Sequence, residues 1–317
     1  MAKSIQGIHH ITALASDASK NIEFYVGILG LRLVKVTVNP DDPSAYHLFY
    51  GNETGRPGTI LSFFCYPHLH VGQLGKDQVH CVALSIPKGS PSFWKKRLKN
   101  FGISYTQEEN PLGESLLQLQ DPDGLSIALI VDENDFRPGN PSGMIKEEKS
   151  IRGIHHLKLC VEGYDDLDQS LKDYLDHKMV QETTNYIRLS ASGKPGDFLD
   201  ITCKPYLLPG KIGLGAVHHV SLKTPNTSQL KNLRKSLVKA GFNTSLLLDR
   251  RYYHAFYFRE MGGILFEIAT QAPGFSVDES LEDLGKTLKL PAGMETRRKA
   301  IEKALPKLIV DLERFEV

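Results

Sequence analysis

The chain has 317 residues, of which 41% are hydrophobic and 24% charged, as in a globular protein large enough for more than one hydrophobic core. Its 38 basic and 37 acidic side chains leave a formal net charge of +1, which gives no reason to expect nucleic acid or a membrane surface as the partner. The four cysteines form no C-x-x-C pair and the first residues, MAKSIQG, carry no apolar signal segment, so we expect buried thiols and a cytoplasmic location.

The first predicted element is a strand with the sequence GIHHITALA, which begins at Gly7. Near copies follow along the chain as QVHCVALSI from Gln78, GIHHLKLCV from Gly153 and VHHVSLKT from Val217. Apolar residues at helical spacing follow each copy, and they predict helices within residues 17–31, 90–103, 165–179 and 228–242. Such recurrence indicates an internal repeat.

Each repeat closes on a turn and a β-rich run, namely RPGTILSFFCY, DPDGLSIALIV, GKPGDFLDITC and EMGGILFEIAT. The chain therefore divides into four modules of one strand, one helix and three strands. We assign modules 1 and 2 to an N-terminal domain (7–132) and modules 3 and 4 to a C-terminal domain (151–272). The Pro- and Gly-rich residues 133–150 form a linker between them, and residues 273–317 form a tail with an amphipathic helix interrupted near Pro306.

Alternation along a strand sorts the paired histidines by face. His10 shares a face with Thr12, and His9 lies on the opposite, apolar face. By the same rule His219 lies on the polar face of its strand and His218 on the other. The second histidine of each pair is therefore the candidate for chemistry.

In the closing strand of module 4, Glu267 points away from the face that its apolar neighbours form. A buried carboxylate is costly unless it is paired or bound to a metal. Two imidazoles and one carboxylate from separate strands make a facial triad that holds non-haem Fe(II) and leaves coordination positions open. Taken singly, each residue is typical of a core or edge position, and Glu267 alone could pair with Arg259.

Several runs carry a family resemblance. GIHHITAL, VKVTVNPDDPSAYHLFYG, VHHVSL and DRRYYHAFYFREMGGILFEIAT with APGFSVDE resemble the vicinal oxygen chelate superfamily, and more narrowly its bacterial ring-cleaving dioxygenases of the hydroquinone type. The resemblance implies an α+β fold of βαβββ modules paired into open barrels, followed by a C-terminal helix. It also implies Fe(II) held by modules 1 and 4, which here means His10, His219 and Glu267.

An alternative ligand set remains open. Extradiol catechol dioxygenases of the superfamily use modules 3 and 4, so His156 could replace His10 beside His219 and Glu267. Asp200 is the counterpart of Glu267 in module 3. Cys81, His156 and Asp200 could therefore form a second metal site; otherwise they are relics of duplication that bind no metal. The counterparts of Glu267 in modules 1 and 2 are Ser62 and Ala128, which are not expected Fe(II) ligands.

The resemblance also supplies the residues around the metal. It implies that Tyr257 hydrogen-bonds a phenolate and that Arg250 stabilises developing negative charge. His9, Thr12 and His218 adjoin the ligands and are candidates to orient them or relay protons.

The expected function is therefore Fe(II)-dependent opening of a dihydroxylated aromatic ring with O2, in detoxification or catabolism. The partners are a small aromatic diol and O2, and open strand edges favour a homo-oligomer. Three alternatives remain: extradiol catechol cleavage, glyoxalase-like thiol chemistry with Mn, Ni or Zn, and non-catalytic binding of small molecules in resistance. Glyoxalase-like sites usually need a further carboxylate, where module 1 offers Ser62.

Overall fold

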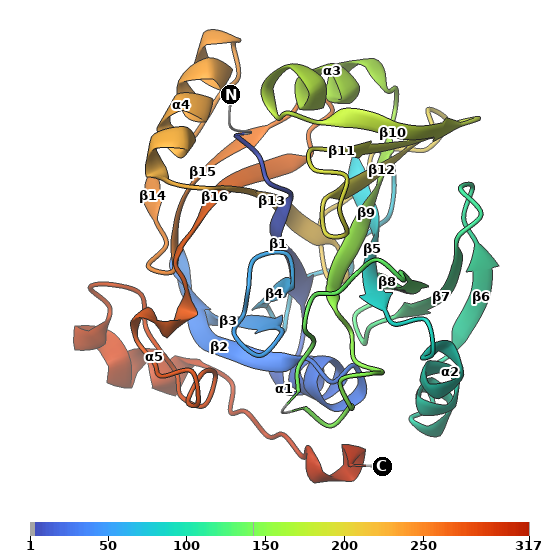
Figure 1. The fold of residues 1–317 in the computed structure, drawn as a ribbon. Coiled ribbons are helices and arrows are strands. Elements are labelled where there is room, and N and C mark those ends of the chain that lie inside the picture. Colours follow the sequence, from blue (N-terminus) through green and yellow to red (C-terminus); the bar gives the residue numbers. More distant parts are fainter. Residues whose placement is uncertain (1–3, 142, 317) are drawn as a thin grey trace.

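The computed structural model describes residues 4–141 and 143–316, which form four βαβββ modules and a C-terminal tail (Figure 1). Module 1 consists of β1 (Ile8–Ala15), α1 (Ala18–Ile22), the π-helix η1 (Glu23–Ile28), β2 (Arg32–Asn39), β3 (Asp42–Gly51) and β4 (Ile60–Cys65). Module 2 consists of β5 (Gln78–Ile86), α2 (Pro91–Asn100), β6 (Tyr105–Glu109), β7 (Ser115–Gln120) and β8 (Ser126–Val131). Module 3 consists of β9 (Gly153–Val161), α3 (Asp165–Tyr174), β10 (Lys178–Thr183), β11 (Tyr186–Ser190) and β12 (Phe198–Cys203). Module 4 consists of β13 (Val217–Thr224), α4 (Thr227–Lys239), β14 (Leu248–Asp249), β15 (Tyr253–Arg259) and β16 (Leu265–Pro273).

The helices begin and end where local chemistry allows. The Asp17 side chain accepts hydrogen bonds from the first-turn amides of α1, and the Asn226 side chain does the same for α4. Gly30 follows the first helical segment with a φ of +71°, a left-handed conformation that suits glycine. The sequence predicted one α-helix here, whereas its second half winds as a π-helix that buries Tyr25. No helix in the described parts of the chain is long and apolar enough to cross a membrane.

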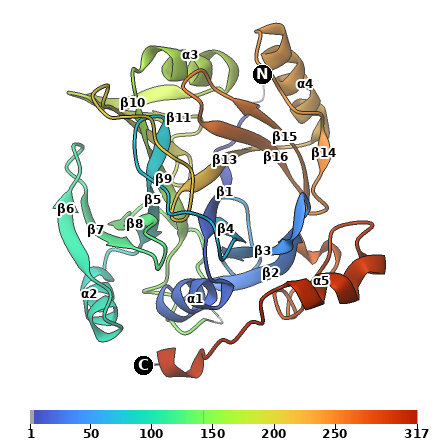
Figure 2. The same cartoon turned by 180° about the vertical axis from the view of Figure 1, so that it is seen from behind.

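The described strands form two curled sheets of eight strands each. One joins modules 1 and 4 in the order β14-β15-β16-β13-β1-β4-β3-β2, and the other joins modules 3 and 2 in the order β10-β11-β12-β9-β5-β8-β7-β6. Figures 1 and 2 show the blue strands beside the orange strands and the cyan strands beside the green ones, with the helices outside. The α+β fold of paired barrels is thereby confirmed.

The sheets do not follow the order of the modules along the chain. β1 pairs antiparallel with β13, and β5 pairs antiparallel with β9, so each sheet crosses between residues 7–132 and residues 151–272. The strand edges that modules 1 and 2 leave open are thus paired by the later modules. The division into domains 7–132 and 151–272 therefore remains a prediction. Each of the two sheets contains strands from both ranges.

β-Bulges interrupt these central pairs at the histidines. Ile8 faces Leu222 and His10 faces Ser221, which leaves His9 as the extra residue of β1. The register places His218 in the same way on β13, and His80 and His155 on β5 and β9. A bulge re-aims the side chain that it carries. The alternation assumed from the sequence therefore breaks at the first histidine of each pair.

The tail returns to module 1. It contains η2 (Phe275–Val277), η3 (Glu295–Arg297), α5 (Arg298–Ala304) and η4 (Glu313–Phe315). The first part of the predicted amphipathic helix is present as α5, which buries Ile301, whereas residues 306–312 do not continue it as a helix. Lys35 of β2 is fully buried and pairs with Asp278 at 2.6 Å and with Glu279, which ties the tail to the first sheet. Figure 1 shows α5 beside β2 and β3.

Candidate metal centre

Three strands of the first sheet bring His10, His219 and Glu267 together. They belong to β1, β13 and β16, and their side chains are 1%, 4% and 0% exposed. His10 Nε2 lies 3.2 Å from Glu267 Oε2 and 3.3 Å from His219 Nε2, and His219 Nε2 lies 3.8 Å from the same carboxylate oxygen. One ligand atom from each residue lies within 4.8 Å of the others, the spacing of a metal site.

The bulged His9 determines which nitrogen His10 presents. His9 Nε2 contacts the carbonyl oxygen of Thr270 at 3.2 Å, and because a carbonyl only accepts, this nitrogen carries the proton of the neutral ring. His9 Nδ1 must then accept from His10 Nδ1, 2.8 Å away. His10 Nε2 is left as a lone pair directed at the centre. Burial lowers the pKa of His9 to about 3, with a further lowering by Lys223, and burial lowers that of His10 well below its usual value, so both rings are neutral.

Module 4 repeats this arrangement. His218 Nδ1 lies 2.9 Å from His219 Nδ1, so the neighbouring histidine again contacts the ring nitrogen that faces away from the centre. Thr12 Oγ1 lies 3.0 Å from His219 Nε2 and 2.7 Å from Ser62 Oγ. His9, Thr12 and His218 therefore adjoin the proposed ligands, and the paired histidines have a physical explanation: one orients the other.

Glu267 lacks a counter-ion within this cluster. Neither of its side-chain oxygens has a hydrogen-bond partner in good geometry among the described residues, although Ser221 and Tyr257 are its neighbours on the adjacent strands. Burial raises the pKa of Glu267 to about 7 despite these two neighbours. A buried carboxylate without a donor is costly and calls for a cation or a proton.

The donor set fits a divalent metal. Two neutral imidazole nitrogens and one carboxylate oxygen converge as acceptors on a single point, and lone pairs so close together repel one another unless a positive species lies between them. Two histidines and one carboxylate are also the ligands of non-haem Fe(II) sites with open positions. The geometry thus suits a metal held by His10, His219 and Glu267.

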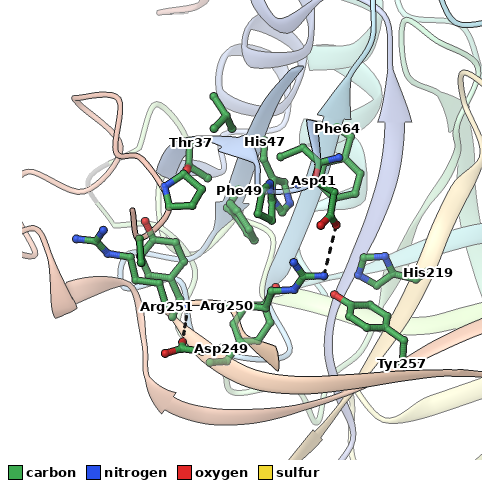
Figure 3. Close-up of a pocket in the computed structure, with 17 residues that line it drawn as sticks. Thr37, Asp41, His47, Phe49, Phe64, His219, Asp249, Arg250, Arg251 and Tyr257 are labelled. Carbon is green, nitrogen blue, oxygen red and sulfur yellow. Dashed lines mark hydrogen bonds and ion pairs between the residues drawn. The ribbon is translucent and has the colours of Figure 1, made fainter. Parts of the chain in front are cut away.

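An aromatic cavity of about 300 Å³ opens beside His219 (Figure 3). It is lined by residues of modules 1 and 4 and of the tail, namely Thr37, Val38, Asn39, Pro40, Asp41, His47, Phe49, Phe64, His219, Asp249, Arg250, Arg251, Tyr252, Tyr253, Tyr257, Pro291 and Ala292. Its size and its mixture of rings with a few polar groups suit a small aromatic ligand.

Tyr257 and Arg250 both border this cavity. The Tyr257 ring lies 5.4 Å from the ring of His219, and the Arg250 guanidinium lies 5.3 Å from the centre of the Tyr257 ring. Figure 3 shows Arg250 between Tyr257 and Asp41, whose carboxylate is 3.7 Å from Nη2. Burial and then Glu267 raise the pKa of Tyr257 well above its usual value. Both side chains can thus donate hydrogen bonds to a ligand beside the metal.

His156 and Asp200 lie in the second sheet. His156 Nε2 is 3.5 Å from Asp200 Oδ2, but that carboxylate also accepts two hydrogen bonds of 2.7 Å from Arg188 and one from Tyr186. The structure therefore does not bring His156 to His219 and Glu267. Cys81, the third member of the possible second site, contacts the Gln118 side chain at 3.6–3.8 Å.

Sequence reasoning missed three features of these two centres: the bulges, Arg188 and His47. Arg188 is the cross-strand neighbour of Asp200, just as Tyr257 is the cross-strand neighbour of Glu267. Alignment of the four repeats could have revealed this correspondence. The bulges leave no pattern in the sequence apart from the doubled histidine itself.

Comparisons with known proteins identify the family of the chain. Residues 7–129 match the model of the Glyoxalase/Bleomycin resistance protein/Dioxygenase superfamily. The chain is 40% identical over 304 residues to a Bacillus subtilis protein named "Putative ring-cleaving dioxygenase MhqE", covering 96% of this chain and 99% of that one. It is 29% identical to the chlorohydroquinone/hydroquinone 1,2-dioxygenase of Sphingobium indicum, covering 93% and 94% of the two chains. The crystal structure of a putative dioxygenase from B. subtilis superposes with a TM-score of 0.93 at 37% identity, covering 98% of this chain and 99% of that one.

Proposed function

The chain belongs to the Glyoxalase/Bleomycin resistance protein/Dioxygenase superfamily, and we propose that it is an Fe(II)-dependent dioxygenase that opens the ring of a hydroquinone-like diol with O2. The observation that carries the proposal is the convergence of two neutral imidazoles and an unpaired buried carboxylate beside an aromatic cavity. The names of the near-full-length relatives support the same reaction class.

His10, His219 and Glu267 would hold the metal, which would supply a binding point for a phenolic oxygen and O2 and a route for charge between them. His9 and His218 hold the Nδ1 atoms of the two ligand histidines, so both Nε2 atoms stay directed at the metal.

Two further side chains act on the substrate. The Tyr257 hydroxyl donates a hydrogen bond to the phenolate oxygen, and the permanent charge of Arg250 stabilises negative charge as it develops on the ring. The aromatic lining of the cavity excludes water and packs on the ring faces.

Thiol chemistry of the glyoxalase kind receives less support. Ser62 stands in module 1 at the position of Glu267, is fully buried and contacts Thr12 and His47. Module 1 therefore offers a hydroxyl where a fourth ligand, a second carboxylate, would be needed. A biological role in removing hydroquinones or quinones follows from the proposed reaction, and a gene disruption that left sensitivity to these compounds unchanged would count against it.

The direct test is oxygen uptake by protein reconstituted anaerobically with Fe(II). We expect uptake with methylhydroquinone, one O2 consumed per ring opened, and none in His10→Ala. Uptake with catechol but not with methylhydroquinone, retained in His10→Ala, would contradict the proposal and favour a site at His156. The absence of uptake with either compound would leave binding or thiol chemistry as the function.

A further inference from the structure

We propose that His47 is a further substrate-binding residue, whose imidazole hydrogen-bonds the ring hydroxyl remote from the metal and so selects a para-diol over a monophenol. The proposal rests on the function proposed above, because it assumes that an aromatic ring occupies the cavity. The position of His47, the contacts that anchor it and its uniqueness among the repeats each support the proposal.

His47 lines the same cavity as the metal ligand His219, but it belongs to a different strand, β3. Its ring packs between two phenyl rings, with centroid distances of 4.0 Å to Phe49 and 4.3 Å to Phe64. Figure 3 shows His47 and the two phenyl rings together on one wall of the cavity, apart from His219 and Tyr257. An aromatic substrate held at His219 therefore meets a wall that is apolar except for one imidazole.

A series of polar side-chain contacts anchors the imidazole of His47. His47 Nε2 lies 3.2 Å from Ser62 Oγ, which lies 2.7 Å from Thr12 Oγ1, and this oxygen in turn contacts His219 Nε2 at 3.0 Å. Ser62, itself in contact with Thr12, thus holds one nitrogen of His47 beside the metal centre. The other nitrogen of His47, Nδ1, makes no hydrogen bond to a described residue, and the residue is 7% exposed.

The free nitrogen suits a hydroxyl rather than a charged group. Burial lowers the pKa of His47 well below its usual value, and Arg250 and His218 lower it further, so the ring is neutral. Depending on the tautomer of the neutral ring, Nδ1 either donates or accepts one hydrogen bond. A phenolic hydroxyl can be the partner in both cases, because it donates and accepts. A hydroquinone carries its two oxygens at opposite ends of the ring, and the cavity lining holds the proposed ligand His219 on β13 and His47 on β3.

Comparison of the modules shows that this nitrogen is special to module 1. His47 faces Phe64 across the β3–β4 pair, two residues before the neighbour of Ser62. The corresponding residues of the other modules are Leu116, Tyr186 and Ala255. Packing of the repeat therefore does not require a histidine at this position.

The test compares His47→Leu with His47→Asn, two substitutions of nearly the same shape. The asparagine amide retains a polar atom near the position of Nδ1, whereas leucine has none. Fe(II)-loaded protein is titrated without O2 by calorimetry with hydroquinone and with 4-fluorophenol, which matches hydroquinone in size but lacks the second hydroxyl. Melting temperatures of all proteins are measured alongside.

We expect the natural protein and His47→Asn to prefer hydroquinone, and His47→Leu to lose about three- to tenfold in hydroquinone affinity with 4-fluorophenol affinity unchanged. Equal losses for both ligands, or none, would overturn the assignment. Preference for hydroquinone that depends on His47 in a protein without oxygen uptake would uphold it while refuting the proposed reaction. Failure of the natural protein to bind either ligand would overturn both.

Discussion

The two sheets hold the same arrangement of an acid and a paired histidine, but the acids have different cross-strand neighbours. In the first sheet the cross-strand neighbour of Glu267 is Tyr257, and the carboxylate has no hydrogen-bond partner among the described residues. In the second sheet the neighbour of Asp200 is Arg188, whose guanidinium lies 2.7 Å from each carboxylate oxygen. One exchanged residue therefore separates an acid that needs a cation from an acid that already has one.

The pKa values of the two acids show the same contrast. Burial raises that of Glu267 to about 7, whereas His156 and Arg188 outweigh burial and lower that of Asp200. Arg188 is itself held by Glu114 at 2.6 and 2.7 Å, so the second centre is a closed ion network. We infer that Arg188 balances the charge of the acid in the second sheet, as the proposed metal ion would in the first.

The largest expected effect separates the two acids. Glu267→Gln should abolish nearly all metal binding and turnover, because it removes the charged ligand. Asp200→Asn should keep the metal and instead lower the free energy of unfolding by about 3 kcal/mol, because Arg188 loses its buried partner. Metal analysis and urea unfolding of both variants show which acid binds the metal and which one stabilises the fold. Loss of metal in Asp200→Asn would reverse the assignment.

Removal of the guanidinium should cost stability without touching the metal. We expect Arg188→Met to lower the free energy of unfolding by about 3–5 kcal/mol, since it leaves the carboxylates of Asp200 and Glu114 without their cation. In a double-mutant cycle the additional change Asp200→Asn should restore part of this loss. A loss in the double variant equal to the sum of the two single losses would show that the two groups do not interact.

The pH dependence of stability should also differ between the acids. In metal-free protein the folded state keeps a proton on Glu267 up to about pH 7, while the unfolded state releases it near 4.5, so stability falls as pH rises through this window. The loss is on the order of 3 kcal/mol. It should be absent in Glu267→Gln, as measured by urea unfolding of chelated protein from about pH 4.5 to 8. Asp200 acts oppositely: its contribution is present above its ordinary pKa and is lost in acid.

A smaller effect on metal binding is expected when Glu267 of the first sheet is given an arginine neighbour, as Asp200 has in the second. Tyr257→Arg places a guanidinium beside Glu267 and should weaken metal affinity at least about tenfold through charge repulsion. The matched variant Tyr257→Phe should keep its metal and lose turnover only. Competitive titration with a metal indicator distinguishes the two. Unchanged affinity in Tyr257→Arg would show that the neighbour of the acid does not decide which sheet binds metal.

The smallest effect is expected at His156. Because this residue lies in the second sheet beside Asp200, His156→Ala should leave metal content and oxygen uptake unchanged. The same measurements on His10→Ala provide the contrast. Loss of metal and uptake in His156→Ala, with both retained in His10→Ala, would support the ligand set of modules 3 and 4.

Local signals were enough to predict much of the fold. Alternating strands, helical spacing and turn residues recur four times, and they identified the modules, the stop at Gly30 and the helix before Pro306. They also indicated the second histidine of each pair and Glu267 as candidate ligands, and the family resemblance then favoured His10, which the structure brings to His219 and Glu267. The π-helical turn after α1 was not predicted, because its residues follow ordinary helical spacing.

The sequence by itself determined the four modules and the types of ligand, because both depend on neighbours within one strand, helix or turn. Only the tertiary structure decided which strand edges pair, and hence that module 1 joins module 4. Pairing also creates the bulges that aim His9 and His218 at their neighbours, and it places Arg188 against Asp200. Such contacts join residues far apart in the chain, so their energies depend on register and burial that no local pattern contains.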